Sequence, residues 1–162
     1  MSRLIKFSIR LFQILCIFLI SGITYSVMEI LFKGVDKGTH WSMFVLSGVA
    51  GVVFIDGLNN VFSYEMDLLL QSATCSIMIT IWEYFTGNIF NLDYSIWDYR
   101  NIPFNLDGQI CLPFTILWFI LSIIFIPVLD YIEWKVFKYK YDEPPYYKIF
   151  NHIIFRFRKD NE

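Results

Sequence analysis

Two glutamates, Glu29 and Glu83, stand out as residues able to do chemistry, because each one follows a long apolar run. No charged residue occurs from Leu11 to Met28, or from Leu68 to Trp82. A carboxylate at such a depth is costly in a bilayer and usually faces a helix-bundle interior or a water-filled cavity. Two such groups predict a site that binds a cation or exchanges protons. The alternative is a structural role, in which the carboxyls are hydrogen-bonded between helices.

The composition of the chain predicts a membrane protein. Of its 162 residues, 56% are hydrophobic and 17% are charged, which is too little polar surface for a soluble domain. A spanning helix needs about 20 mainly apolar residues, and four segments fit: 11–31, 41–58, 67–85 and 110–129. Their unbroken apolar runs lack the alternation of barrel strands. We therefore predict an all-α, polytopic membrane protein with four transmembrane helices in residues 1–135.

The distribution of Lys and Arg predicts the orientation of these helices. Basic residues gather at both ends of the chain, namely Arg3, Lys6, Arg10, Lys135, Lys138, Lys140, Lys148, Arg156, Arg158 and Lys159. The loop after the third span contains one, Arg100. Because basic loops stay inside, we expect both termini to be cytoplasmic and Glu29 and Glu83 to lie near the outer side.

The loops expected on the outer side contain the other candidate site residues. We expect the substrate or ion site to combine Glu29 and Glu83 with His40, Trp97, Asp98, Arg100, Asn105 and Asp107. Simpler roles are open for each: the Trp residue in an interfacial belt, Arg100 paired with Asp98 or a neighbouring acid, Asp107 with Gly108 in a turn, and Asn105 as a cap for the backbone. His40 has no second His or Cys at ligand spacing, so we predict neither a metal nor another cofactor.

Acidic residues near the inner ends of the spans have a simpler interpretation. Asp56, Asp130 and Glu133 lie at or near the ends of the second and fourth spans. We expect them to be hydrated by water at the interface. In the second span, Ser47 and Gly51 form a pair of small residues that allows close helix approach. We expect this pair to pack within the chain, and self-association is the alternative.

Residues 136–162 are predicted to form a basic cytoplasmic tail that contains an amphipathic helix. Its apolar face would comprise Ile149, Phe150, Ile153, Ile154 and Phe157, opposite Lys148, His152, Arg156 and Lys159. Such a helix suits the anionic inner leaflet, here through Lys148, Arg156 and Lys159. Docking onto a protein partner through the apolar face is the alternative. We predict no nucleic-acid partner.

A long motif gives this chain a family resemblance. Trp97-Asp98-Tyr99, followed after a short spacer by residues 103–112 (PFNLDGQICL), resembles the hallmark of the bacterial ABC-transporter type IV (CmpB-like) proteins. Residues 82–87 (WEYFTG), residues 38–43 (GTHWSM) and Glu29 also resemble that family, and the similarity covers 25–130. The charged tail and the region of Asp56 depart from it. The resemblance implies a multi-pass permease of the bacterial plasma membrane.

Transport of a small solute or ion is therefore the leading functional hypothesis. The sequence has no G-x-x-x-x-G-K-[ST] loop, so the chain is not itself the ATPase, and we expect a separate ATPase subunit or a homo-oligomer. One alternative is a membrane scaffold or regulator that does not transport. The other is a membrane enzyme with the paired carboxylates as acid and base. We do not favour it, because neither a metal constellation nor an activated nucleophile supports it.

Overall fold

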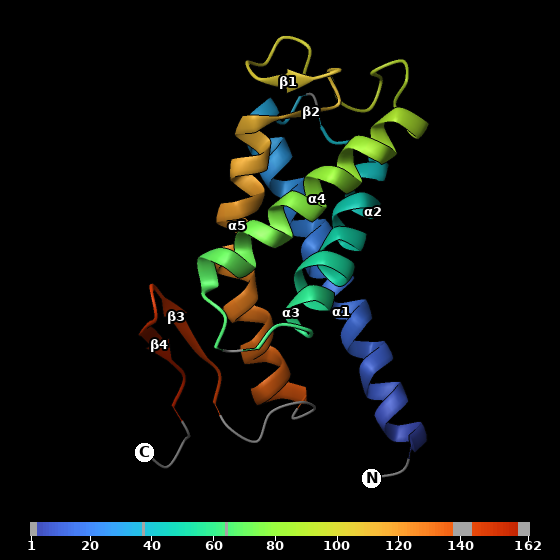
Figure 1. Cartoon of the computed structure of the whole chain (residues 1–162). Coiled ribbons are helices and arrows are strands. Elements are labelled where there is room, and N and C mark those ends of the chain that lie inside the picture. Colours follow the sequence, from blue (N-terminus) through green and yellow to red (C-terminus); the bar gives the residue numbers. More distant parts are fainter. Residues whose placement is uncertain (1–2, 37, 64, 138–143, 159–162) are drawn as a thin grey trace.

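The computed structural model describes residues 3–36, 38–63, 65–137 and 144–158, and four of its helices are long and apolar enough to cross a membrane. They form a bundle (Figure 1). The spans are α1 (Arg3–Lys33), α2 (Trp41–Ala50) continued by η1 (Gly51–Asp56) and α3 (Gly57–Asn59), α4 (Leu68–Phe90), and α5 (Leu112–Ile132) continued by η2 (Glu133–Phe137). The prediction of a mainly helical, multi-pass membrane protein is confirmed.

Two of these helices extend well beyond their predicted ends. Helix α1 begins at Arg3 and contains Arg10, whereas we expected the first span to begin at Leu11. The guanidinium of Arg10 forms ion pairs with Asp56 and Glu133 inside the bundle, so this charge does not end the helix. The fourth span likewise continues past residue 129 into η2, a π-helical segment.

Small residues set the distance between α1 and α2. A Cβ atom at Gly48 would lie 2.6 Å from the ring of Phe18, and one at Gly51 would lie 2.0 Å from the hydroxyl of Ser21. Gly22 of α1 is equally close to Phe44 of α2. The predicted close approach within the chain is confirmed, because at these glycines the side chains of one helix contact the backbone of the other.

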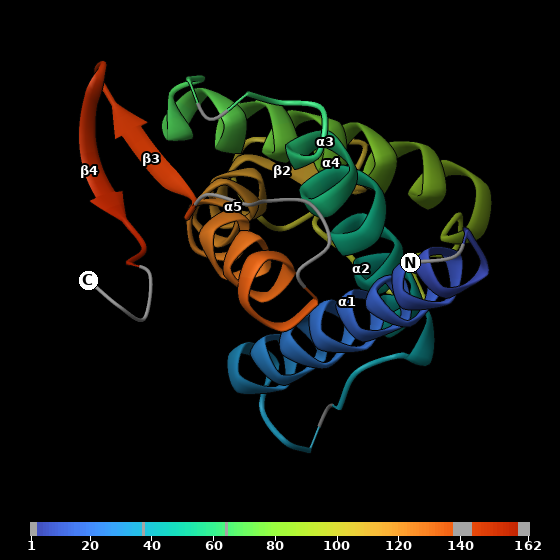
Figure 2. The same cartoon turned by 90° about the horizontal axis from the view of Figure 1, so that it is seen from below.

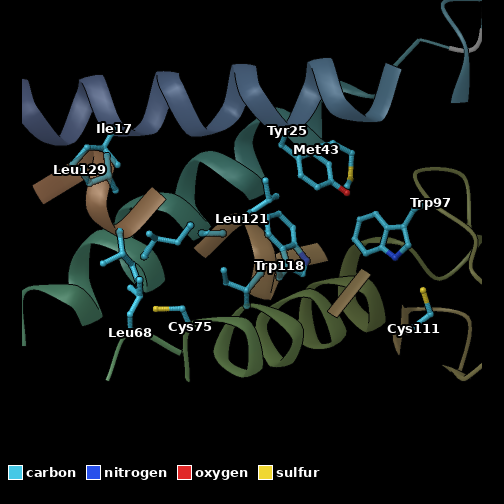
Figure 3. Close-up of a cluster of buried hydrophobic side chains, with 14 of the residues drawn as sticks. Ile17, Tyr25, Met43, Leu68, Cys75, Trp97, Cys111, Trp118, Leu121 and Leu129 are labelled. Carbon is cyan, nitrogen blue, oxygen red and sulfur yellow. The ribbon is translucent and has the colours of Figure 1, made fainter. Parts of the chain in front are cut away.

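The buried core runs along the length of the bundle (Figure 3). Ile17 and Leu129 lie at one end, whereas Tyr25, Trp97 and Trp118 gather at the other. We call the second end, which carries residues 91–111, the loop end, and the end where α1 begins the terminal end (Figure 1). The large aromatic side chains of the core are thus concentrated beside the loops.

A short hairpin covers the loop end. Strands β1 (Asn105–Leu106) and β2 (Ile110–Cys111) are antiparallel. The turn between them places Asp107 at φ 53° and Gly108 at φ 65°, the positive values that an Asp-Gly hairpin turn adopts readily. The turn expected at these two residues is confirmed.

The predicted amphipathic helix in the C-terminal tail is wrong. Residues 146–156 form a hairpin of β3 (Tyr146–Ile149) and β4 (His152–Arg156), which stands beside α5 on the far side from α2 (Figure 2). Phe150 and Asn151 at its turn both have positive φ, at 48° and 64°. The β-branched and aromatic residues of this segment favour strands. Tyr147 also fixes β3 to α5, because its hydroxyl donates a hydrogen bond to Asp130 at 2.7 Å.

Candidate functional site

A cavity of about 220 Å³ lies at the loop end of the bundle. Its wall combines the last turns of α1, the loop after α4 and the first turns of α5. The residues that line it are Tyr25, Met28, Glu29, Trp97, Asp98, Tyr99, Ile102, Phe114 and Leu117. Three of the eight predicted site residues, Glu29, Trp97 and Asp98, therefore share one cavity.

Glu29 supplies one carboxylate of this cavity. It lies near the end of α1, and only 7% of its surface is exposed. The hydroxyl of Thr39, in the segment that leads into α2, donates a hydrogen bond to its Oε2 atom. The contact joins the end of α1 to the start of the second span and holds the carboxylate beside the cavity.

Glu83 lies behind the cavity wall and is also 7% exposed. It projects from α4 into a separate small pocket of about 20 Å³, which Tyr25, Trp97 and Trp118 also line. The hydroxyl of Tyr99 donates to its Oε1 at 3.0 Å, and the indole N–H of Trp118 faces its Oε2 at 3.4 Å. Since Tyr99 also lines the larger cavity, its side chain connects that cavity to Glu83 by a hydrogen bond.

Stacked aromatic rings build the rest of the wall. Tyr25 stacks on Trp118 with ring centroids 5.0 Å apart, and Tyr99 stacks on Phe114 at 4.7 Å. Burial, with a smaller effect of Glu83, raises the pKa of Tyr99 well above its ordinary value of 10.0. Tyr99 is thus a neutral hydrogen-bond donor to Glu83 at physiological pH.

Asp98 is the second carboxylate of the cavity wall, and Arg100 neutralises it. The guanidinium of Arg100 donates from Nε at 2.9 Å and from Nη2 at 2.7 Å. These bonds, together with one from the Arg100 backbone, lower the pKa of Asp98 to about 2. The expected Asp98–Arg100 pair is confirmed. Arg100 also lies over the ring of Tyr94, 4.1 Å from its centroid.

The remaining predicted site residues serve the loops around the cavity. Asn105 accepts a bond from the backbone N–H of Gly108 and so closes the β1–β2 turn. Asp107 accepts a bond from the Tyr84 hydroxyl at 2.8 Å. His40 caps the N-terminus of α2, where the backbone N–H of Ser42 donates to its Nδ1 atom. These three residues do not line the cavity.

A buried amide pair, which the sequence analysis missed, holds the loop in place. The side chain of Asn91 donates to the backbone oxygen of Trp97 at 2.7 Å and to the side chain of Gln109 at 3.1 Å. Gln109 donates back to the Asn91 carbonyl at 3.0 Å. The loop also packs closely on α4, because a Cβ at Gly87 would lie 2.3 Å from Gln109. This frame positions Trp97, Asp98 and Tyr99 over the bundle.

A second polar cluster is buried at the terminal end. Arg10 pairs with Asp56 at 2.8 Å and with Glu133 at 3.0 Å, and the amide of Gln13 also donates to Glu133. The two acids are each 1% exposed. Our expectation that they are hydrated span ends is wrong, because Arg10 compensates their charge inside the bundle. Arg10 and Gln13 are three residues apart on one helix face, which was the available signal.

The third acid at this end is buried as well. Asp130 is 0% exposed and accepts hydrogen bonds from the amide of Asn59 and the hydroxyl of Tyr147, both at 2.7 Å. Neutral donors from α3 and β3 replace the water that we expected around it. Asp130 thereby joins three elements that are far apart in the sequence.

Four helices that are long and apolar enough to span a membrane fit a membrane transporter-like protein. The family model described as Putative ABC-transporter type IV matches residues 34–156, and the chain belongs to this family. The match includes α2, α4, α5, the loop end and the C-terminal hairpin. Neither the curated proteins nor the solved structures contain a significant match to the chain.

Proposed function

We propose that this protein is the membrane-spanning component of a transport system and that the loop-end cavity binds its small solute or ion. The observation that carries the proposal is the cavity itself, with Glu29 and Asp98 in its wall and Glu83 one hydrogen bond away through Tyr99. Carboxylates at membrane depth are costly, and they commonly mark ion pathways and proton relays. In this proposal His40, Asn105 and Asp107 shape the entrance, and Arg100 and Trp97 hold Asp98 in position.

The proposed orientation places the cavity on the outer face of a bacterial plasma membrane, with both termini in the cytoplasm. The excess of Lys and Arg near the chain ends supports it, because basic segments next to spans remain on the cytoplasmic side. Residues 1–135 would then form the transport domain. Residues 136–162 would lie at the inner surface.

The proposed partners follow from this arrangement. A pathway built by four spans alone is narrow, so the protein works as an oligomer or with a separate ATPase subunit, as the family name suggests. The anionic inner leaflet remains the proposed contact of the β3–β4 hairpin, through Arg156 at its exposed strand. Lys148 is engaged by Glu65, and Lys159 lies outside the described residues.

Solute uptake by membrane vesicles tests the proposal. Right-side-out vesicles from a deletion strain and from a complemented strain are loaded with ATP and given a solute mixture, and the retained solutes are compared by mass spectrometry. Glu29→Gln and Glu83→Gln should each abolish the difference between the strains, and the double variant should add little, because groups that act as a unit are not additive. Asp93→Asn, which changes an exposed loop carboxylate outside the cavity, is the matched control.

One result would replace the transport proposal by the scaffold alternative. If both Gln variants fold and retain solutes as the wild type does, the carboxylates are structural. The exposed Ile154 and Phe155 on β4 would then be the candidate contact for a protein partner at the terminal end. An enzyme would instead show turnover of an added compound without its accumulation in the vesicles.

A further inference from the structure

The wall of the loop-end cavity is aromatic as well as acidic. Four rings line it, those of Tyr25, Trp97, Tyr99 and Phe114. They come from α1, the loop and α5, so three separate parts of the chain place an aromatic side chain at the same cavity. Glu29 and Asp98 are the two carboxylates among them.

This combination discriminates between classes of solute. An anion would meet two carboxylates, and a neutral apolar solute would remove water from them without compensation. A small inorganic cation requires several oxygen ligands, but the Tyr99 hydroxyl already donates to Glu83. A cation that carries its charge on methylated nitrogen needs no such ligands, because ring faces attract it and a carboxylate balances its charge.

The volume of the cavity limits the size of the solute that it can bind. Sites for drug-sized ligands have volumes of about 300–1,000 Å³, whereas this cavity has about 220 Å³. It therefore suits a solute with few non-hydrogen atoms. The aliphatic side chains of Met28, Ile102 and Leu117 complete the wall and match methyl or methylene groups next to the charged nitrogen.

We propose that the loop-end cavity binds a small organic ammonium cation, held by the rings of Tyr25, Trp97, Tyr99 and Phe114 with Glu29 as its counter-charge. This inference rests on the proposed function and names the solute class of the same site. Asp98 is the second acid of the wall and pairs with Arg100.

Choline and its neutral isostere 3,3-dimethylbutan-1-ol provide the test, because they differ in charge and hardly in shape. The full-length protein in lipid nanodiscs is titrated with each compound in a calorimeter. Choline should bind at least about tenfold more tightly than the isostere, as expected for a desolvated cation–π contact. Equal affinities would overturn the proposal, since the cavity would then select only apolar shape.

Variants of the wall extend the test. Phe114→Leu should weaken choline binding about tenfold, whereas Phe104→Leu, at an exposed ring on the same loop, should leave it unchanged. Because Phe114 also supports Tyr99, a folding defect is checked by size exclusion. Glu29→Gln gives an independent readout, as it should weaken choline binding while leaving the weak binding of the isostere unchanged. Choline binding that neither variant weakens would place the cation elsewhere and overturn the proposal.

The two proposals fail in different ways. If Na⁺ or K⁺ displaces choline at equimolar concentration, the site selects inorganic ions and the ammonium class is wrong. If choline does not bind but the Gln variants still abolish vesicle uptake, the solute class is again wrong and the transport function stands. If choline does not bind and the Gln variants leave vesicle uptake unchanged, both proposals fall.

Discussion

The Tyr99 hydroxyl donates to a carboxylate that is almost fully buried, so its removal has a predictable effect on stability. Tyr99→Phe should lower the free energy of unfolding by about 1–3 kcal/mol, because Glu83 loses a donor and no water replaces it. Tyr94→Phe is the matched control, since the Tyr94 hydroxyl makes an exposed bond to the backbone of Asp107. Unfolding curves in detergent micelles measure both variants. If both variants lose the same free energy of unfolding, the buried bond to Glu83 contributes no more than the exposed bond of Tyr94.

Arg10 should be more sensitive than other basic residues of α1. Arg10→Ala leaves Asp56 and Glu133 without this cation, and breaking a buried ion pair costs about 3–5 kcal/mol. Arg10→Lys should recover only part of this, because one ammonium cannot match the planar, forked geometry of a guanidinium that bonds two acids. Lys6→Ala, at an exposed position one turn earlier, should change stability by less than about 0.5 kcal/mol. Thermal unfolding in nanodiscs ranks the three variants.

Individual residues could be predicted from the sequence where a charged side chain is costly inside a membrane. Glu29 and Glu83 interrupt apolar runs, and both are buried at the loop end. Tyr25 and Tyr99 were missed, because a tyrosine beside a membrane interface is too common to indicate a site. The burial of Glu133 was missed as well, since the position of its partner Arg10, 123 residues away, shows only that Arg10 shares a helix face with Gln13.

At the level of helix pairs, the contact between α1 and α2 depends on the absence of a side chain. Gly48→Ala would force a Cβ to within 2.6 Å of Phe18 and should destabilise the fold by about 1–3 kcal/mol through overpacking. Phe18→Leu on the same background should restore much of this loss by making room. The double-mutant cycle is measured by unfolding in micelles. If the stability losses of the two single variants add in the double variant, Gly48→Ala and Phe18 do not compete for space.

The hairpin β3–β4 should detach from the bundle in acid. Hydrogen bonds from Lys148 and Tyr146 lower the pKa of Glu65 below its ordinary value of 4.5. A lowered carboxylate pKa stabilises docking above the unfolded pKa, and this stabilisation is lost as the pH falls through the lower folded value. A dye on a cysteine replacing the exposed His152 should therefore keep high anisotropy at neutral pH and lose it as the pH falls below the ordinary glutamate value of 4.5.

Glu65→Gln is the variant that isolates this contact. It should give low anisotropy of the same dye across the pH range, because a neutral amide cannot form an ion pair with Lys148. Asp93→Asn, at the opposite end of the molecule, should behave as the wild type does. If Glu65→Gln also behaves as the wild type does, the other contacts of the hairpin, such as those of Tyr147 with Asp130 and of Phe157 with Tyr131, hold it without this ion pair.

The type of this element was the main error of the sequence analysis. The segment 146–157 has apolar residues at spacings that fit a helix face, and the same residues also have high strand propensity. Tertiary contacts decide between helix and strand here. The Tyr147 hydroxyl donates to Asp130, and the rings of Phe157 and Tyr131 pack with centroids 4.9 Å apart. The four spans needed no such contacts, since length and composition alone require a helix in lipid.

For the whole molecule, the orientation is the property that is simplest to measure. A cysteine at Asn101 in the loop should react with an impermeant thiol reagent in intact cells, and one at His152 should react only after lysis. The native cysteines should interfere little, because Cys75 and Cys111 are buried and Cys16 is half-buried. The reverse pattern would place the cavity on the cytoplasmic side.

The π-helical segments η1 and η2 determine which deletions the polar clusters at the terminal end can tolerate. Each contains a buried acid, Asp56 in η1 and Glu133 in η2. A single residue turns an α-helix by about 100°, so a deletion in the α-helical part of the second span would rotate the residues on either side of it relative to each other. A π-helical turn holds one residue more than an α-helical turn, so deletion of Val53 would let η1 close into an α-helical turn while Asp56 and Asn59 keep facing Arg10 and Asp130. Loss of one apolar residue should therefore be tolerated within η1 and not within α2.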